Sequence, residues 1–171
     1  NKVGKLIFLC FIYWIMNKTF YRDFILVFVI TATFDFLMNI TPPPFGAILL
    51  REYFDHHTIL AAALIAGVGG ALPFLPIAYL IDYKKANLKN MAIIFWISAF
   101  IGVLMEHSTI FPVLKKYYYD KLPRYQSFLA DGLSGMMVAS VFWTITIPYK
   151  NRRKLYFMLP LWVSIFIINH I

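Results

Sequence analysis

The sequence predicts an all-α protein, a polytopic bundle of transmembrane helices forming a single domain over residues 1–171. Apolar side chains make up 61% of the chain and charged side chains only 14%, against about 25% charged in a soluble domain. A soluble protein of this size leaves too much surface in water to hide so many apolar groups. The apolar residues also form long, evenly apolar runs. Because lipid offers backbone groups no hydrogen-bond partners, such runs should be helices rather than the alternating strands of a membrane barrel.

Five apolar runs approach the roughly 20 residues that a transmembrane helix needs. They cover residues 24–40, 58–81, 91–114, 128–148 and 155–171. The shorter run at residues 6–16 follows Lys2 and Lys5, so we expect an interfacial segment or a truncated sixth span there. Prolines 42–44 cannot all be helical, and the amphipathic stretch Ala47–His57 that follows them predicts a short helix on the membrane surface. The sequence therefore predicts five spans, or six if residues 6–16 also cross.

Small residues in the second predicted span indicate close helix packing. Gly67, Gly69 and Gly70 lie within four positions of one another. Because helices in lipid associate mainly through van der Waals contact, such residues let two backbones approach closely.

The distribution of lysine and arginine predicts the orientation. The formal net charge is +8, from 16 Lys and Arg against 8 Asp and Glu. In a soluble protein this excess would suggest nucleic acid, but here it indicates loops held against anionic lipid headgroups. Basic loops tend to stay in the cytoplasm, which places residues 84–90 and 150–154 there and residues 42–57 on the opposite, outer side. We therefore expect the lipid bilayer as a partner and no nucleic acid, and other membrane subunits or a second copy are left open.

Four ionisable residues lie inside the apolar runs, namely Asp35, Glu106, His107 and Asp131. An ionised group facing lipid costs at least about 2.5–3.5 kcal/mol, so such residues normally face the bundle interior or water. The three carboxylates fall in the outer halves of three different spans. We therefore expect one outward-facing acidic cavity, with His107 at its edge, that handles protons, a divalent cation or a cationic ligand. The alternative is a set of separate hydrogen bonds, in which Asp131 caps the fourth helix near its N-terminus.

Metal and cofactor signals are weak. Cys10 is the single cysteine, so no internal disulfide or cysteine zinc knuckle is expected. His56 and His57 are adjacent and point about 100° apart on a helix, which favours a solvated pair over a shared ion and leaves the metal unknown. We expect no nucleotide, because no glycine-rich phosphate loop with a following lysine is present. No haem or other cofactor is expected either.

Gly132-Leu133-Ser134-Gly135 stands at the outer start of the fourth span. This motif resembles the nucleophile motif of rhomboid intramembrane proteases, in which the serine pairs with a histidine two spans later. The resemblance implies Ser134 as the catalytic nucleophile, in a chain truncated before its histidine span. The second span lacks the family's H-x-x-x-N pattern and begins Thr58–Ala63 instead. A small-residue patch for helix packing explains the motif equally well.

Three further stretches, Tyr79–Lys85, Phe111–Asp120 and Ala130–Gly135, resemble parts of small polytopic membrane proteins of large DNA viruses. That resemblance implies a viral or host-derived internal membrane and no established activity. We therefore expect a structural, scaffolding or small-transport component of a membrane rather than an enzyme. The alternative from a different class is the serine protease built on Ser134.

Overall fold

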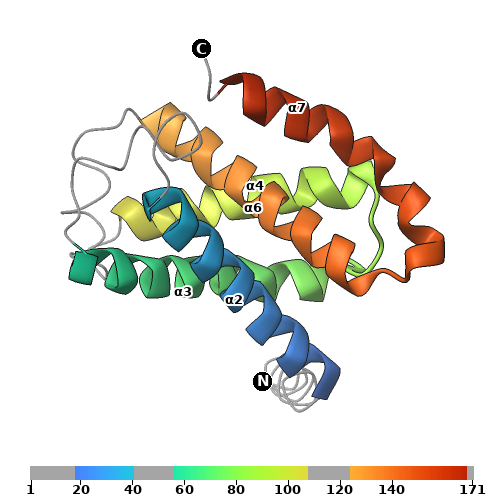
Figure 1. The fold of residues 1–171 in the computed structure, drawn as a ribbon, viewed down its shortest axis with the longest axis horizontal. Helices are drawn as coiled ribbons and strands as arrows, with labels where there is room; N and C mark the ends of the chain where they lie inside the picture. Colours follow the sequence, from blue (N-terminus) through green and yellow to red (C-terminus); the bar gives the residue numbers. More distant parts are fainter. Residues whose placement is uncertain (1–17, 41–55, 108–123, 169–171) are drawn as a thin grey trace, which may run out of the picture.

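The computed structural model describes residues 18–40, 56–107 and 124–168, and all of the regular elements in these ranges are helices (Figure 1). They are α2 (Lys18–Ile40), α3 (His56–Leu80), α4 (Leu88–His107), α6 (Arg124–Thr146), the 3₁₀ helix η3 (Tyr149–Met158) and α7 (Leu159–Ile168). The predicted all-α class is confirmed. The stretch at residues 6–16 and most of the predicted surface helix at Ala47–His57 lie outside the described residues.

Three helices are long and apolar enough to cross a membrane. They contain the segments Ala63–Leu80, Leu88–Met105 and Phe128–Thr146. These segments correspond to the predicted spans at 58–81, 91–114 and 128–148. The prediction of five or six spans is not confirmed.

The first predicted span lies within one continuous α-helix, whereas the last predicted span is divided between two helices of different type. Residues 24–40 lie in α2, a helix of 23 residues that also includes the charged pair Arg22 and Asp23. The run at 155–171 is divided, because residues up to Met158 belong to η3 and only ten described residues form α7. The change of helix type occurs next to Pro160, whose missing N–H is tolerated in the first turn of an α-helix.

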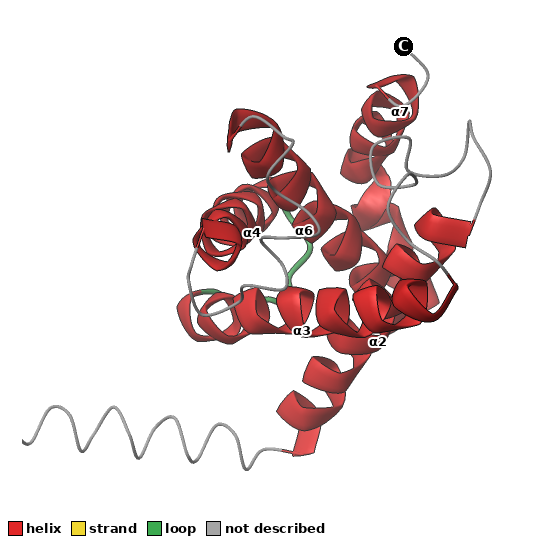
Figure 2. Cartoon of the chain, turned by 90° about the vertical axis from the view of Figure 1, so that its left-hand side faces the viewer, coloured by secondary structure: helices red, strands yellow, loops and turns green. Residues whose placement is uncertain are grey.

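The helices pack as two close pairs, α2 with α3 and α4 with α6 (Figures 1 and 2). Further contacts of α3 with α4 and of α2 with α6 join the pairs into one bundle. The largest buried side chains gather near the end of the bundle where α3 and α6 finish. There Phe74 stacks on Phe20 at a ring distance of 5.7 Å and approaches Phe142 at 6.3 Å. Trp143 is 1% exposed.

Glycines form the contact surfaces within each pair, as the small residues of the second span predict. In the first pair, a β-carbon on Gly70 would lie 2.8 Å from Cβ of Thr31, and one on Gly67 would lie 2.9 Å from the ring of Phe28. In the second pair, Gly135 leaves no space for a β-carbon beside Ser98. The missing side chains therefore allow the paired helices to approach more closely than larger residues would.

Candidate functional site at the basic end

One end of the bundle carries most of the positive charge. The start of α2, the loop at residues 81–87, the start of α4 and the segment after α6 all lie there (Figure 1). We call residues 18–23, 81–90 and 147–158 the basic end. Its nine cationic residues are Lys18, Arg22, Lys84, Lys85, Lys89, Lys150, Arg152, Arg153 and Lys154, and its carboxylates are Asp23 and Asp82. The two basic segments that we expect in the cytoplasm therefore lie at the same end of the bundle.

Asp23 is the centre of this end, and its side chain is completely buried. The Tyr83 hydroxyl donates a hydrogen bond of 2.7 Å to Oδ2 of Asp23. The Arg22 guanidinium donates to Oδ1 from Nη2 at 2.9 Å and from Nε at 3.1 Å. The Lys84 ammonium lies 3.7 Å from Oδ2. Burying a carboxylate is costly unless it is paired and hydrogen-bonded, and these contacts supply both conditions.

The two cations around Asp23 remain in contact with water. The side chain of Arg22 is 67% exposed and that of Lys84 is 52% exposed, whereas that of Asp23 is 1% exposed. The desolvation cost therefore falls almost entirely on the carboxylate. The Tyr83 hydroxyl is the neutral donor among these three partners.

Tyr83 is held from two sides by helices that are distant in sequence. Its hydroxyl bonds to Asp23 on α2, and its backbone carbonyl accepts a hydrogen bond of 2.6 Å from Nε1 of Trp143 on α6. Its ring packs edge-on against Phe74 of α3 at a centroid distance of 4.9 Å. A single loop residue thus connects three helices.

Two asparagines shape the loop that presents Tyr83. The Asn87 side chain accepts a hydrogen bond of 2.8 Å from the backbone N–H of Asn90, which caps the start of α4. The Asn90 amide donates to the carbonyls of Asp82 at 2.9 Å and Lys85 at 2.7 Å. These bonds satisfy loop carbonyls that would otherwise need water, and they hold the chain on both sides of Tyr83 in place.

The environment of Tyr83 keeps its phenol protonated. Burial raises the pKa of Tyr83 well above its ordinary value of 10.0, and the hydrogen bond to Asp23 and the charge of that carboxylate raise it further. The positive charge of Arg22 acts in the opposite direction but is outweighed. At neutral pH, Tyr83 is therefore a neutral hydrogen-bond donor rather than a proton acceptor.

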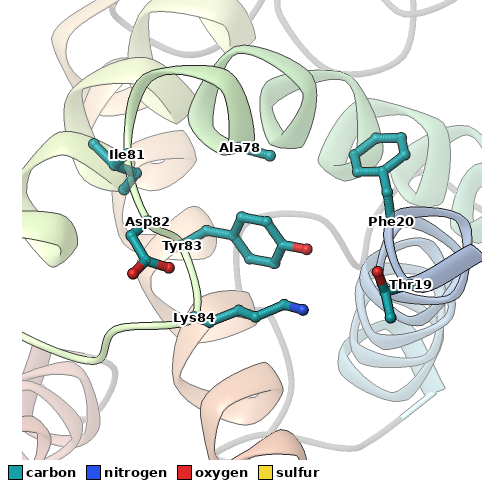
Figure 3. A pocket seen from close by; sticks show the side chains of 7 residues that line it. All are labelled: Thr19, Phe20, Ala78, Ile81, Asp82, Tyr83 and Lys84. Carbon is teal, nitrogen blue, oxygen red and sulfur yellow. The ribbon is translucent and has the colours of Figure 1, made fainter. Parts of the chain in front are cut away.

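A cavity of about 260 Å³ opens beside this centre (Figure 3). Its lining residues are Thr19, Phe20, Ala78, Ile81, Asp82, Tyr83 and Lys84. Figure 3 shows the Tyr83 hydroxyl and the Lys84 ammonium pointing toward Thr19 and Phe20 on α2, while Asp82 lies on the opposite side of the cavity. The part of the cavity next to α2 therefore has an apolar wall and a cationic rim.

The residues predicted to form an acidic cavity lie at the opposite end. Asp131 is half-buried, and its carboxylate lies directly against Gly102 of α4. Because α6 begins at Arg124, Asp131 lies almost two turns inside the helix, so the alternative in which it caps the N-terminus is wrong. Asp35 is also half-buried and lies one turn after Thr31, on the side of α2 that packs on α3.

Glu106 and His107 are the last two residues of α4, and their side chains lie outside the described part of the structure. The convergence of Asp35, Glu106 and Asp131 on one cavity therefore stays a prediction. His56 and His57 begin α3, and their side chains are likewise not described. Within the described residues, no group of three or more His, Cys, Asp or Glu side chains is placed to hold a metal ion.

The two glycines around Ser134 pack against α4. Gly132 lies directly against the Phe95 ring and Gly135 against the Ser98 side chain, whereas Ser134 itself is exposed. These are the contacts that a small-residue packing patch makes. The role of Ser134 as a nucleophile stays a prediction.

Sequence reasoning missed the Asp23 centre, because Asp23 immediately precedes the apolar run at 24–40 and lies outside the predicted span. A signal was present: Phe20 and Val27, three residues before and four residues after Asp23, are both buried, so Asp23 shares the packed face of α2. Its pairing with Tyr83 had no local signal. The chain matches no protein-family model, no curated protein and no solved structure.

Proposed function

We propose that the protein is a structural, scaffolding component of a membrane, a multi-pass bundle whose basic end lies at the cytoplasmic surface of the bilayer. The observation that carries this proposal is the basic end itself. Nine Lys and Arg residues gather at the end where two of the three candidate spans finish and the third begins. Basic residues near an anionic membrane surface contribute about 1 kcal/mol each to the attraction.

The contacts of Asp23 support a structural rather than a catalytic role. The carboxylate is occupied by Tyr83, Arg22 and Lys84, and the same tyrosine is bonded to Trp143. Tyr83 is held in its neutral form and is a poor general base, because a useful base titrates near the working pH. These groups connect the ends of helices to one another.

The orientation is tested with single cysteines in a Cys10→Ser background. Lys85→Cys and Lys154→Cys should react with an impermeant thiol reagent only after the membrane is opened, and Tyr125→Cys at the far end should react in intact cells. The three positions are exposed in the structure. Reaction of positions 85 and 154 in intact cells would invert the orientation, and extraction of the chain by alkaline carbonate would overturn membrane integration.

Reconstitution into liposomes tests the structural role against transport. We expect proton and divalent-cation flux no greater than in empty liposomes. A flux that depends on Asp35, Glu106 or Asp131 would overturn the structural proposal and favour the acidic transport cavity.

A further inference from the structure

We propose that the cavity beside Tyr83 binds the phosphate headgroup of an anionic phospholipid, with the Lys84 ammonium as the cationic donor and Thr19 in its polar lining. This inference rests on the proposed membrane location of the basic end, and it adds a specific ligand site to a surface that would otherwise attract lipid only through its overall charge. The cavity, the polarity of its lining and the local charge each support it.

The position and polarity of the cavity fit a lipid headgroup. Ala78 lies two residues before the end of the candidate span Ala63–Leu80, so the cavity opens where the apolar part of the bundle ends. Phe20, Ala78 and Ile81 form an apolar wall beside the polar groups of Thr19 and Lys84 (Figure 3). A free phosphate ion would gain nothing from that wall, whereas the glycerol and first methylenes of a lipid would bury apolar surface there.

The size of the cavity fits a headgroup rather than a whole lipid. Its volume of about 260 Å³ lies just below the roughly 300–1,000 Å³ of sites that enclose a drug-sized ligand. The acyl chains would therefore remain outside, along the exposed surface of the bundle. Tyr79 and Leu80, which are 66% and 63% exposed, lie on α3 next to the cavity residue Ala78.

The local charge favours an anion at the side of the cavity next to α2. Three cations, Lys18, Arg22 and Lys84, lie at or beside the cavity, against the two carboxylates Asp23 and Asp82. Lys84 lies 3.7 Å from Asp23, and an ammonium group has three donors, so it can contact a phosphate oxygen and keep its attraction to the carboxylate.

The two remaining polar residues of the cavity are Asp82 and Tyr83. Asp82 is paired with Lys85 at 3.3 Å, and it lies on the side of the cavity opposite Thr19 and Phe20 (Figure 3). The Tyr83 phenol carries no charge because it stays protonated.

Native mass spectrometry of the delipidated full chain in detergent tests this site, with phosphatidylglycerol as the probe. We expect phosphatidylglycerol to bind about tenfold more tightly than phosphatidylcholine, corresponding to about 1.4 kcal/mol. Inorganic phosphate should not bind saturably. Equal binding of the two lipids would overturn the preference for an anionic headgroup. Saturable binding of inorganic phosphate that competes with the lipid would identify a site for the free ion and overturn the lipid proposal.

Two variants and a matched control locate the site. Lys84→Met and Thr19→Val should each weaken phosphatidylglycerol binding severalfold, whereas Lys85→Met, which removes the same charge from the adjacent residue outside the cavity, should not. Thr19→Val leaves every contact of Asp23 described above intact, so it separates headgroup binding from the loss of those contacts. Equal losses in Lys84→Met and Lys85→Met, or no loss in Thr19→Val, would overturn the site.

The result of the lipid-binding experiments can be distinguished from the result of the cysteine labelling that tests the proposed function. Loss of the lipid site would leave the cysteine-labelling pattern unchanged. An inverted labelling pattern would overturn the cytoplasmic placement without altering the lipid binding measured in detergent.

Discussion

At the basic end the helices are joined by hydrogen bonds, whereas in the middle of the bundle they are joined by close contact at glycines. The hydrogen bonds of Tyr83 to Asp23 and from Trp143 to Tyr83 each connect residues 60 positions apart in the chain. The contacts of Gly70 with Thr31 and of Gly135 with Ser98 need no polar partner on the glycine side. A substitution at the basic end therefore removes a hydrogen bond, whereas a substitution at one of these glycines adds atoms between two closely packed helices.

In the proposed membrane placement, this difference follows from the surroundings of each region. In the middle of a membrane bundle, lipid tails are as apolar as the helices, so association depends on van der Waals contact and small residues shorten the distance. Near the headgroups, water and ions compete for polar side chains. A hydrogen bond there gains strength from burial, which Asp23 has and its exposed cations do not. We therefore expect substitutions in the hydrogen-bonded basic end to lower the free energy of unfolding more than substitutions at the glycine contacts.

The largest effect is expected at Asp23. Asp23→Ala should lower the free energy of unfolding by about 3 kcal/mol, because the half-buried Tyr83 loses the acceptor of its hydroxyl and the buried carboxylate leaves a cavity. Asp82→Ala is the matched control. Its carboxylate is 56% exposed and pairs with exposed Lys85, so the change should stay within about 0.5 kcal/mol. Unfolding by SDS titration in mixed micelles measures both, and equal effects would contradict the central role of Asp23.

A smaller, pH-dependent effect is expected at Tyr83. Tyr83→Phe removes one hydrogen bond to a charged group, which should cost about 1.5 kcal/mol at neutral pH. Because the folded-state pKa lies above the ordinary value of 10.0, the folded protein holds the phenol proton more tightly than the unfolded chain. This contribution is therefore fully present below about pH 10 and is lost as the pH rises through the folded-state pKa.

Unfolding measured between pH 8 and pH 12 separates this contribution from those of the other tyrosines. The stability difference between the wild type and Tyr83→Phe should be constant up to about pH 10 and then shrink. A difference that grows in alkali would mean that Tyr83 does not hold its proton in the folded state.

The smallest effect is expected at the glycine contacts. Gly70→Ala should destabilise the bundle by about 1 kcal/mol, since the added methyl group meets the Thr31 side chain and part of that cost is offset by the better helix propensity of alanine. At Gly69 the nearest atom to an added β-carbon is the flexible Met105 methyl group at 3.9 Å. Gly69→Ala should therefore be neutral or slightly stabilising, and a comparison of thermal unfolding in detergent would show whether helix contact or propensity dominates.

The positions of the candidate spans could be predicted from the sequence, because lipid solubility depends on composition within one continuous segment. The predicted spans at 58–81, 91–114 and 128–148 overlap α3, α4 and α6, and the helices begin two to four residues earlier than the apolar runs. The reason for the earlier starts is that a helix can continue into polar sequence, as the cap at Asn87 shows for α4. Hydropathy predicted one span over residues 155–171, but within the described part of this run the chain changes from a 3₁₀ helix to an α-helix after Met158.

The sequence by itself determined that this chain is helical, that it is apolar enough to enter a membrane, and that its basic residues occur between apolar runs. Those properties depend on neighbouring residues and on transfer from water to lipid. Only the tertiary structure decided that Asp23 is buried, that Tyr83 bonds to it, and that Trp143 holds the same tyrosine from α6. The physical reason is that a buried carboxylate is stable only where distant segments bring it donors and cations, and the arrangement of those segments is set by how the helices pack.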